Sequence, residues 1–336
     1  MAVGIQSDLK IFPDQFYGGF NEVLSQNSNV FNANSANAIR LFTNVSRGYF
    51  SEEGFFDTIA SLAARRDVTS TASLTPVNLS ADSMIAPKRL AGTPLIAQTI
   101  SSMQTAGLSG SSEDAMRNFS FVVGEQVAKA MLDEMLNTAL SCAVATTGKS
   151  SNTFLSILGA STKTMNYQSL NAATYKLGDN ASQIVAYVMH SQQAQSLINQ
   201  SIGIATDRVA GATIYQGVAG TFGKPLIVTD SSSLVKTDGV STGVPSYYAL
   251  ALREGALDLR LSEEPIIYSD LDPGFTAGIA LRYRSNWGYN IRVAGYSMTA
   301  NNTNPTDAQL AAGGNWTQVF TDFKNTAGVR LETTGA

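Results

Sequence analysis

The stretch from Ser111 to Ala145 reads SSEDAMRNFSFVVGEQVAKAMLDEMLNTALSCAVA, with no proline and a single glycine, Gly124. Ser111 or Ser112 can cap a helix, two acidic residues follow where carboxylates suit the helix dipole, and Gly148 closes the far end. The stretch therefore predicts one helix. At 1.5 Å per residue it is about 50 Å long, well beyond the average helix of a globular protein.

The apolar side of this predicted helix changes along its length. In the first half, three- and four-residue spacing places these residues on one face: Met116, Phe119, Val123, Val127 and Ala130. Beyond Met131 the apolar set is centred roughly half a turn away, at 100° per residue, and consists of Leu132, Met135, Leu136, Ala139, Leu140 and Ala143. We therefore expect a long cross-piece that presents one side to one neighbour and the other side to a second.

Composition limits the classes of function. The 336 residues predict about two domains, at roughly 150 residues each. Charged residues make up only 14% of the chain, against about 25% in typical proteins, and the net charge is −4. This favours a subunit that buries much of its exterior against copies of itself. Because no Lys/Arg-rich run is present, tight nucleic-acid binding is not expected.

The chain carries no signal for export or for a membrane. Cys142 is the only cysteine, so an internal disulfide is excluded. The first residues, MAVGIQSDLK, have no apolar signal core, and no apolar run reaches the ~18 residues of a membrane span. We expect a soluble protein made in the cytoplasm.

Two segments before the long helix lack a compact pattern of their own. Residues 1–66 are either an extended arm over neighbouring surfaces or a loosely packed N-terminal subdomain, with a short amphipathic helix from Phe55 to Arg65-Arg66. Residues 67–100 predict a two-stranded excursion around a turn at residues 80–83, with prolines that suit edge strands. Because an isolated ribbon is marginal in water, it should lie on its own domain or on the next subunit.

The second half of the chain predicts an α+β domain followed by a hairpin. Buried strands are expected at 184–189 and 225–229, a short helix at 190–200, and two more strands in 247–261 around a Glu254-Gly255 turn. Alternation on both sides of Asn286-Trp287-Gly288 predicts a hairpin whose apolar side covers the first half of the long helix. A polar tail from 301 has a possible short helix around Leu310 and an aromatic patch at Trp316 and Phe320.

Patterns that carry chemistry are weak in this chain. Gly148-Lys149-Ser150 ends like a phosphate-binding loop, but Ala143 stands where the first glycine belongs and a helix precedes it. His190 is the only histidine, and no GxSxG motif accompanies it. One histidine and one cysteine cannot build a Cys/His metal site. Adjacent acidic pairs such as Asp133-Glu134 point apart and indicate solvated or inter-subunit charges. We therefore predict no catalytic, cofactor or metal site.

The order of these parts resembles the major capsid proteins of tailed bacteriophages with the Hong Kong phage-type capsid fold. The local similarities include Leu177-Gly178-Asp179 before the strand that ends at Val188-Met189-His190, Gly223-Lys224-Pro225-Leu226 before another strand, and the Glu254-Gly255 turn. The resemblance implies this division: N-terminal arm 1–66, extended loop 67–100, spine helix with part of a peripheral domain 101–179, axial domain 180–270, and peripheral-domain hairpin with C-terminal tail 271–336.

The resemblance also implies partners and a place in the virion. The subunit would form hexamers and pentamers of an icosahedral shell, assembled in the host bacterial cytoplasm around double-stranded DNA without sequence-specific binding. A separate scaffolding protein, a portal protein and possible decoration or cement proteins would be its partners, without a covalent cross-link. Assembly contacts are expected at Arg65, Arg66, Leu79, Asp82, Lys88, Arg89, Glu254, Arg282, Arg284 and Arg292.

Two other classes of function stay open on the sequence. A tail-tube, surface-layer or adhesin subunit would show a similarly low charge. A serine hydrolase that uses His190 is the weaker alternative.

Overall fold

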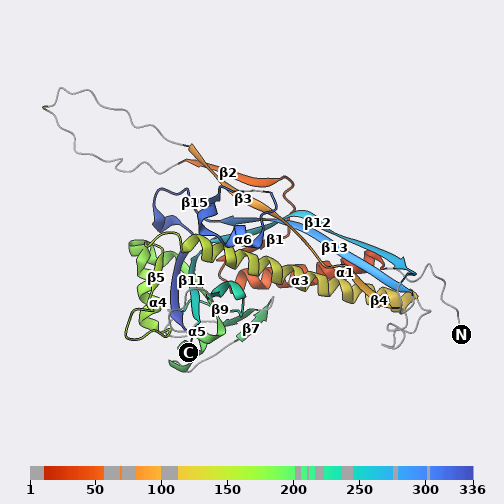
Figure 1. Ribbon diagram of the computed structural model, residues 1–336, viewed down its shortest axis with the longest axis horizontal. Coiled ribbons are helices and arrows are strands. Elements are labelled where there is room, and N and C mark those ends of the chain that lie inside the picture. Colours follow the sequence, from red (N-terminus) through yellow and green to blue (C-terminus); the bar gives the residue numbers. More distant parts are fainter. Residues whose placement is uncertain are drawn as a thin grey trace.

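A computed structural model describes residues 11–56, 69, 81–99, 113–200, 206–209, 212–215, 223–236, 245–274, 279–300 and 303–335. The molecule is elongated, and one long helix, α3, runs through its middle (Figure 1). One sheet lies along this helix, and a second sheet packs near its C-terminal end.

Helix α3 (Glu113–Thr147) confirms the long helix predicted from the sequence. In its first half, Met116, Val123 and Val127 are buried as expected, whereas Ala130 is exposed. Its second half is buried on more sides, because Met131 and Met135 belong to the main core as well as Leu136 and Leu140. The expected change of apolar side is therefore a change in burial: the first half of α3 is buried mainly on one side, and the second half is buried on several sides.

Helix α1 (Pro13–Asn34) covers the first half of α3. The two helices approach closely at two glycines. A Cβ atom at Gly124 would collide with the carbonyl oxygen of Phe16, and one at Gly19 would collide with that of Phe121. Residues 13–42 therefore pack on their own chain as a subdomain, and the alternative of an extended arm over neighbouring surfaces is wrong for them.

The first sheet has the strand order β1-β12-β13-β14-β15, with β3 and β4 also paired to β13 and β2 paired to β3. Its strands are β1 (Ile39–Phe42), β2 (Phe50–Phe56), β3 (Ala81–Gly92), β4 (Ile96–Thr99), β12 (Leu257–Asp272), β13 (Ala280–Val293), β14 (Tyr296–Met298) and β15 (Trp316–Gln318). Tyr283 of β13 meets Phe119 of α3 edge-on, with 6.3 Å between ring centroids. Thus β13 does contact the first half of α3, as the sequence predicted.

The second sheet has the strand order β5-β16-β11-β6-β9-β8-β7, with β10 paired to β11. Its strands are β5 (Phe154–Ser156), β6 (Ile184–Met189), β7 (Thr206–Val209), β8 (Ala212–Tyr215), β9 (Leu226–Val228), β10 (Val235–Lys236), β11 (Ser246–Arg253) and β16 (Gly328–Thr334). Alternate residues of β6 face opposite sides: Val188 joins the core with α3, and Met189 joins a second core. That second core includes α4 (Tyr167–Thr174) and α5 (Ser191–Gln200).

Short helical segments complete the described chain. The 3-10 helix η2 (Tyr175–Gln183) follows α4, and η4 (Ser232–Leu234) lies against α3. Helix α6 (Asp307–Ala311) also packs on α3 and confirms the short helix expected around Leu310. The 3-10 helices η5 (Gly313–Asn315) and η6 (Phe323–Asn325) follow it.

The hairpin predicted around Asn286-Trp287-Gly288 is wrong, because these residues lie inside the continuous strand β13. Odd-numbered residues from Leu281 to Val293 are all buried, and Trp287 is one of them. The alternation therefore passes through the supposed turn without a change of parity, as a single strand requires. The true hairpin partner of β13 is β12.

Strands β2 and β3, which we call the ribbon, also differ from the prediction. Strand β2 pairs with β3, so Phe50–Phe56 forms a ribbon strand that was not expected, and Phe55-Phe56 belong to a strand rather than a helix. The expected turn at 80–83 falls at the beginning of β3. Lys88–Gly92 and Ile96–Thr99 pair with β13 of the same chain, so the base of the ribbon rests on its own body. The expected strand at 74–79 and the end of the helix at Arg65-Arg66 lie outside the described residues.

Two domain boundaries differ from those expected. Strands β11 and β12 flank the predicted Glu254-Gly255 turn, but they enter different sheets, so the axial unit ends near 254 instead of 270. Strand β16 of the supposed tail lies between β11 and β5 in the second sheet. These assignments depend on pairing between distant segments, which local alternation does not encode.

Candidate assembly surfaces

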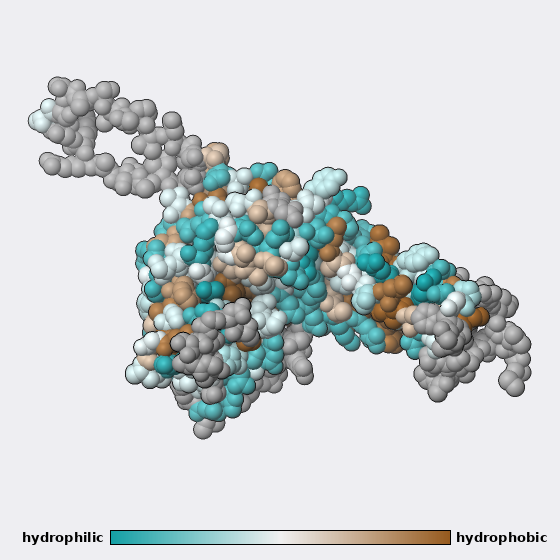
Figure 2. Space-filling model, in the orientation of Figure 1, coloured by the Kyte–Doolittle hydropathy of each residue, from teal (hydrophilic) through white to brown (hydrophobic). Residues whose placement is uncertain are grey.

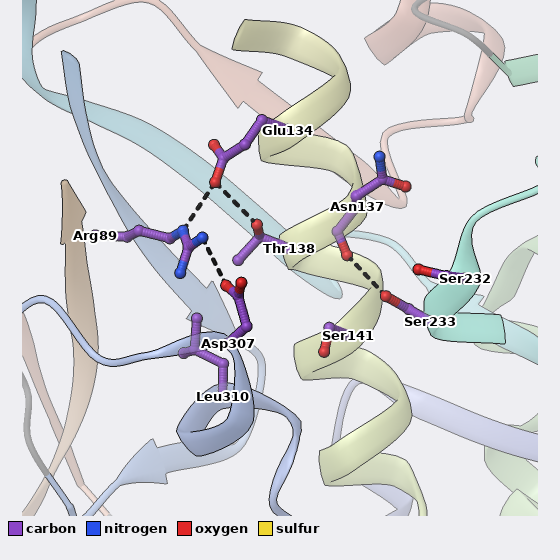
Figure 3. Close-up of a pocket in the computed structure, with 9 residues that line it drawn as sticks. All are labelled: Arg89, Glu134, Asn137, Thr138, Ser141, Ser232, Ser233, Asp307 and Leu310. Atoms are coloured by element: carbon purple, nitrogen blue, oxygen red, sulfur yellow. Dashed lines mark hydrogen bonds and ion pairs between the residues drawn. The ribbon is translucent and has the colours of Figure 1, made fainter. Parts of the chain in front are cut away.

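Arg89 of β3 connects three elements (Figure 3). Its Nε donates to Glu134 Oε1 of α3 at 2.8 Å, and a second guanidinium nitrogen lies 2.6 Å from Asp307 Oδ1 of α6. Burial disfavours the charge of Arg89, but the nearby carboxylates outweigh it, so its pKa is raised. The cluster lines a polar pocket of about 450 Å³ together with Asn137, Thr138, Ser141, Ser232, Ser233 and Leu310.

Arg292 of β13 forms a second cluster at the base of the ribbon. Its Nε donates to Glu53 Oε2 of β2 at 2.7 Å, and its Nη1 donates to Asp258 Oδ2 of β12 at 2.9 Å. Asp258 is buried, which raises its pKa, while Arg292 acts in the opposite direction. Arg292 therefore ties the ribbon to the first sheet within one chain.

Most other charged residues proposed for assembly also find partners inside the chain. Lys88 Nζ lies 2.6 Å from Glu263 Oε1, Glu254 Oε1 lies 2.7 Å from Arg40, and Arg282 lies 3.1 Å from Asp272. The sequence carried no signal for these partners, because each pair joins strands far apart in sequence or needs the strand register. Of the adjacent acidic pairs, Glu53, Glu134 and Glu263 each form an intrachain ion pair, while the side chains of Glu53 and Glu263 stay 58% and 48% exposed.

Two of the exposed proposed residues, Asp82 and Arg284, have no ion pair among the described residues. Asp82 accepts a hydrogen bond from the backbone N–H of Ser83 at 2.7 Å. Arg284 has neither an ion-pair nor a hydrogen-bond partner within the part of the chain that the structure describes. Arg65, Arg66 and Leu79 lie outside the described residues.

Large apolar side chains are exposed on two parts of the molecule, and hydrophobic residues are visible at the end where the far part of β12 lies (Figure 2). On the ribbon, Tyr49 and Phe56 are 77% and 70% exposed. On the far part of β12, Ile266 and Tyr268 are 65% and 66% exposed. Large exposed apolar residues that cluster are typical of protein interfaces.

His190 lies beside Ser191 and Asp230. Its Nδ1 accepts from the backbone N–H of Gln192 at 3.3 Å and lies 3.5 Å from Ser191 Oγ, and its Nε2 lies 3.6 Å from Asp230. These contacts are longer than a nucleophile and its base require. Burial lowers the pKa of His190, although Asp230 opposes this shift. Lys149 of the loop-like Gly-Lys-Ser sequence donates instead to the carbonyl oxygen of Trp316.

Within the described ranges, no group of three or more His, Cys, Asp or Glu side chains is placed to hold a metal ion. No described helix combines the length and the apolarity of a membrane span.

The fold is similar to solved phage capsids. The capsid protein of Ralstonia phage GP4 is 10% identical with a TM-score of 0.51, and the match covers 89% of this chain and 87% of that one. The capsid of Helicobacter pylori bacteriophage KHP30 is 11% identical with a TM-score of 0.49, covering 88% of both chains. At 10% identity, the similarity to the Ralstonia phage capsid shows the fold alone.

The sequence itself identifies the family. A search of curated protein sequences returns no match. The model of the Gp13-like family, described as major capsid protein 13-like, matches residues 8–330. The match includes α1, α3 and nearly all of both sheets. The chain belongs to the Gp13-like family of major capsid proteins, and it is a structural subunit of a capsid.

Proposed function

We propose that this subunit assembles through copies of itself into hexamers and pentamers of an icosahedral shell around double-stranded DNA, and that it acts without catalysis. The family match over residues 8–330 carries the proposal. The exposed aromatic residues of the ribbon and of β12 support it, because both surfaces are apolar beyond what a monomer needs.

The charge distribution agrees with this role. The chain has a net charge of −4, and most cations described above are neutralised by carboxylates of the same chain. A weakly acidic wall does not bind DNA phosphates tightly, so packaged DNA would stay free to leave. A separate scaffolding protein, a portal protein and possible decoration proteins belong to the same proposal, as do assembly in the host cytoplasm and a final place in the virion.

Negative-stain microscopy of the purified protein, alone and with the products of neighbouring genes, tests the proposal. Rings of five or six copies, or closed shells, are expected. A protein that stays monomeric at high concentration, alone and with those products, would contradict it. His190→Ala should leave assembly intact, and loss of a measurable hydrolysis in that variant would instead support the hydrolase alternative.

A further inference from the structure

An aromatic pocket lies where the ribbon meets the body. Phe55 and Phe56 of β2 and Phe320, which follows β15, line a hollow of about 320 Å³. Phe55 and Phe320 meet edge-on with 5.2 Å between ring centroids, so these two walls support each other. Phe56 is 70% exposed, and the pocket can therefore take an apolar side chain from outside.

Two opposite charges stand at this aromatic pocket. Arg253 donates to the carbonyl oxygen of Asn325, and no described carboxylate forms an ion pair with it. Its partial burial lowers its pKa. Asp322 is exposed and accepts a hydrogen bond from the backbone N–H of Lys324 at 3.0 Å, without an ion pair among the described residues. The pocket thus offers apolar walls, the cation of Arg253 and the exposed carboxylate of Asp322, neither of which is in an ion pair among the described residues.

The outer face of the β12–β13 hairpin has the complementary composition, and we call it the tip face. Ile266 and Tyr268 are largely exposed, and Arg284 stands directly opposite Tyr268 in the strand register. Glu264 is also exposed, and neither Glu264 nor Arg284 has a partner in the described ranges. The neighbouring Arg282 is already occupied by Asp272 at 3.1 Å, so the free charges are Glu264 and Arg284.

The aromatic pocket and the tip face cannot meet within one molecule. Figure 1 places β2 and β15 at one end of the long axis and the far part of β12 and β13 at the other. Two different complementary surfaces at opposite ends make a head-to-tail contact, which generates closed rings when the rotation closes. This is the contact type that hexamers and pentamers need.

We propose that the tip face of one copy docks into the aromatic pocket of the next copy. Ile266 and Tyr268 pack against the phenylalanine walls, Glu264 pairs with Arg253, and Arg284 pairs with Asp322. The proposal rests on the proposed function, since it names which surfaces join subunits in the ring. It adds a specific occupant and a charge pattern that sets the register between copies.

A charge exchange tests the contact. Arg284→Asp and Asp322→Arg should each reduce ring formation at least tenfold, measured by mass photometry over a concentration series. The double variant should recover most of it, because the pair is then restored with reversed polarity. Lys129→Glu is the control, since Lys129 is an exposed cation on α3 away from both surfaces, and it should assemble like the wild type.

Three results would overturn the contact. Normal ring formation by either single variant would contradict the contact. A double variant that forms rings no better than the single variants would also contradict it. Rescue of Arg284→Asp by Glu264→Arg would show that two tip faces meet each other instead. Circular dichroism confirms that each variant is folded, which is expected because both side chains are exposed.

Disulfide trapping gives a second, independent measurement. Phe56→Cys with Tyr268→Cys in one chain should form ladders of covalent multimers on oxidation, whereas each single variant should not. Cys142 is buried and does not interfere. If the wild type fails to form rings at all, the proposed function fails. If the wild type forms rings while both tests are negative, only this contact fails.

Discussion

The two halves of α3 are one continuous helix in different surroundings. The first half is covered by α1 and reaches β13 through Phe119, while Val122 on its outer side is 45% exposed. The second half is enclosed, and Met131, Ala139 and Leu140 have no exposed surface. A long helix in this protein is therefore a peripheral element at one end and the centre of the core at the other.

The largest expected effect distinguishes these surroundings directly. Leu140→Asp would place a charge without a partner in the enclosed half, and we expect the protein not to fold, with a loss above about 4 kcal/mol. Val122→Asp, on the exposed side of the first half, should change the free energy of unfolding by less than about 0.5 kcal/mol. Soluble yield and thermal unfolding measure the effect of each variant. Equal effects would show that the two halves of α3 do not differ in burial.

Charge pairs should show the same contrast. Arg89→Met removes the partner of Glu134 beside the second half, where the side chain of Arg89 is only 16% exposed, and should destabilise by about 3 kcal/mol. Lys129→Met breaks the exposed pair with Glu125 in the first half, at 3.9 Å, and should cost about 0.3–0.5 kcal/mol. Urea unfolding of the two variants gives the comparison, and a small effect of Arg89→Met would show that its cluster is dispensable.

Close packing of α1 on the first half should produce an intermediate effect. Gly124→Ala pushes a methyl group against the backbone of Phe16, so α1 must shift, and we expect a loss of about 2 kcal/mol. Gly159→Ala is the matched control, because nothing lies within 4 Å of the added carbon. If Gly124→Ala is as stable as the wild type in urea, the two helices are not in fixed contact.

The smallest expected effect concerns the pH dependence of stability. The pKa of His190 is lowered in the folded state, so the unfolded chain binds more protons once the pH falls below about 6.5, and stability then declines towards the folded-state pKa. Its partner Asp230 and Asp133 of α3 line one pocket of about 480 Å³ beside the second half. His190→Gln should flatten the dependence of Tm on pH below about pH 6.5, and an unchanged slope there would contradict this assignment.

Local patterns predicted the elements but not their partners. The spacing in 111–145 gave α3, and short apolar runs gave β6 and β9, because a buried segment must be apolar wherever it packs. The same reasoning placed a turn inside β13, since Asn286 and Gly288 are turn formers and a strand and a hairpin share the same alternation. Lys88, Arg89 and Arg292 were predicted to contact other subunits, but each pairs with a carboxylate on another strand or helix of the same chain.

The sequence by itself determined a long helix with a changing apolar side in a charge-poor α+β chain, because helix periodicity and composition are local properties. Only the tertiary structure decided that residues 13–42 fold onto that helix, that β11 and β12 enter different sheets, and that most proposed assembly charges are neutralised internally. Strand pairing and ion pairs join residues distant in sequence, so they depend on the whole fold rather than on any single stretch.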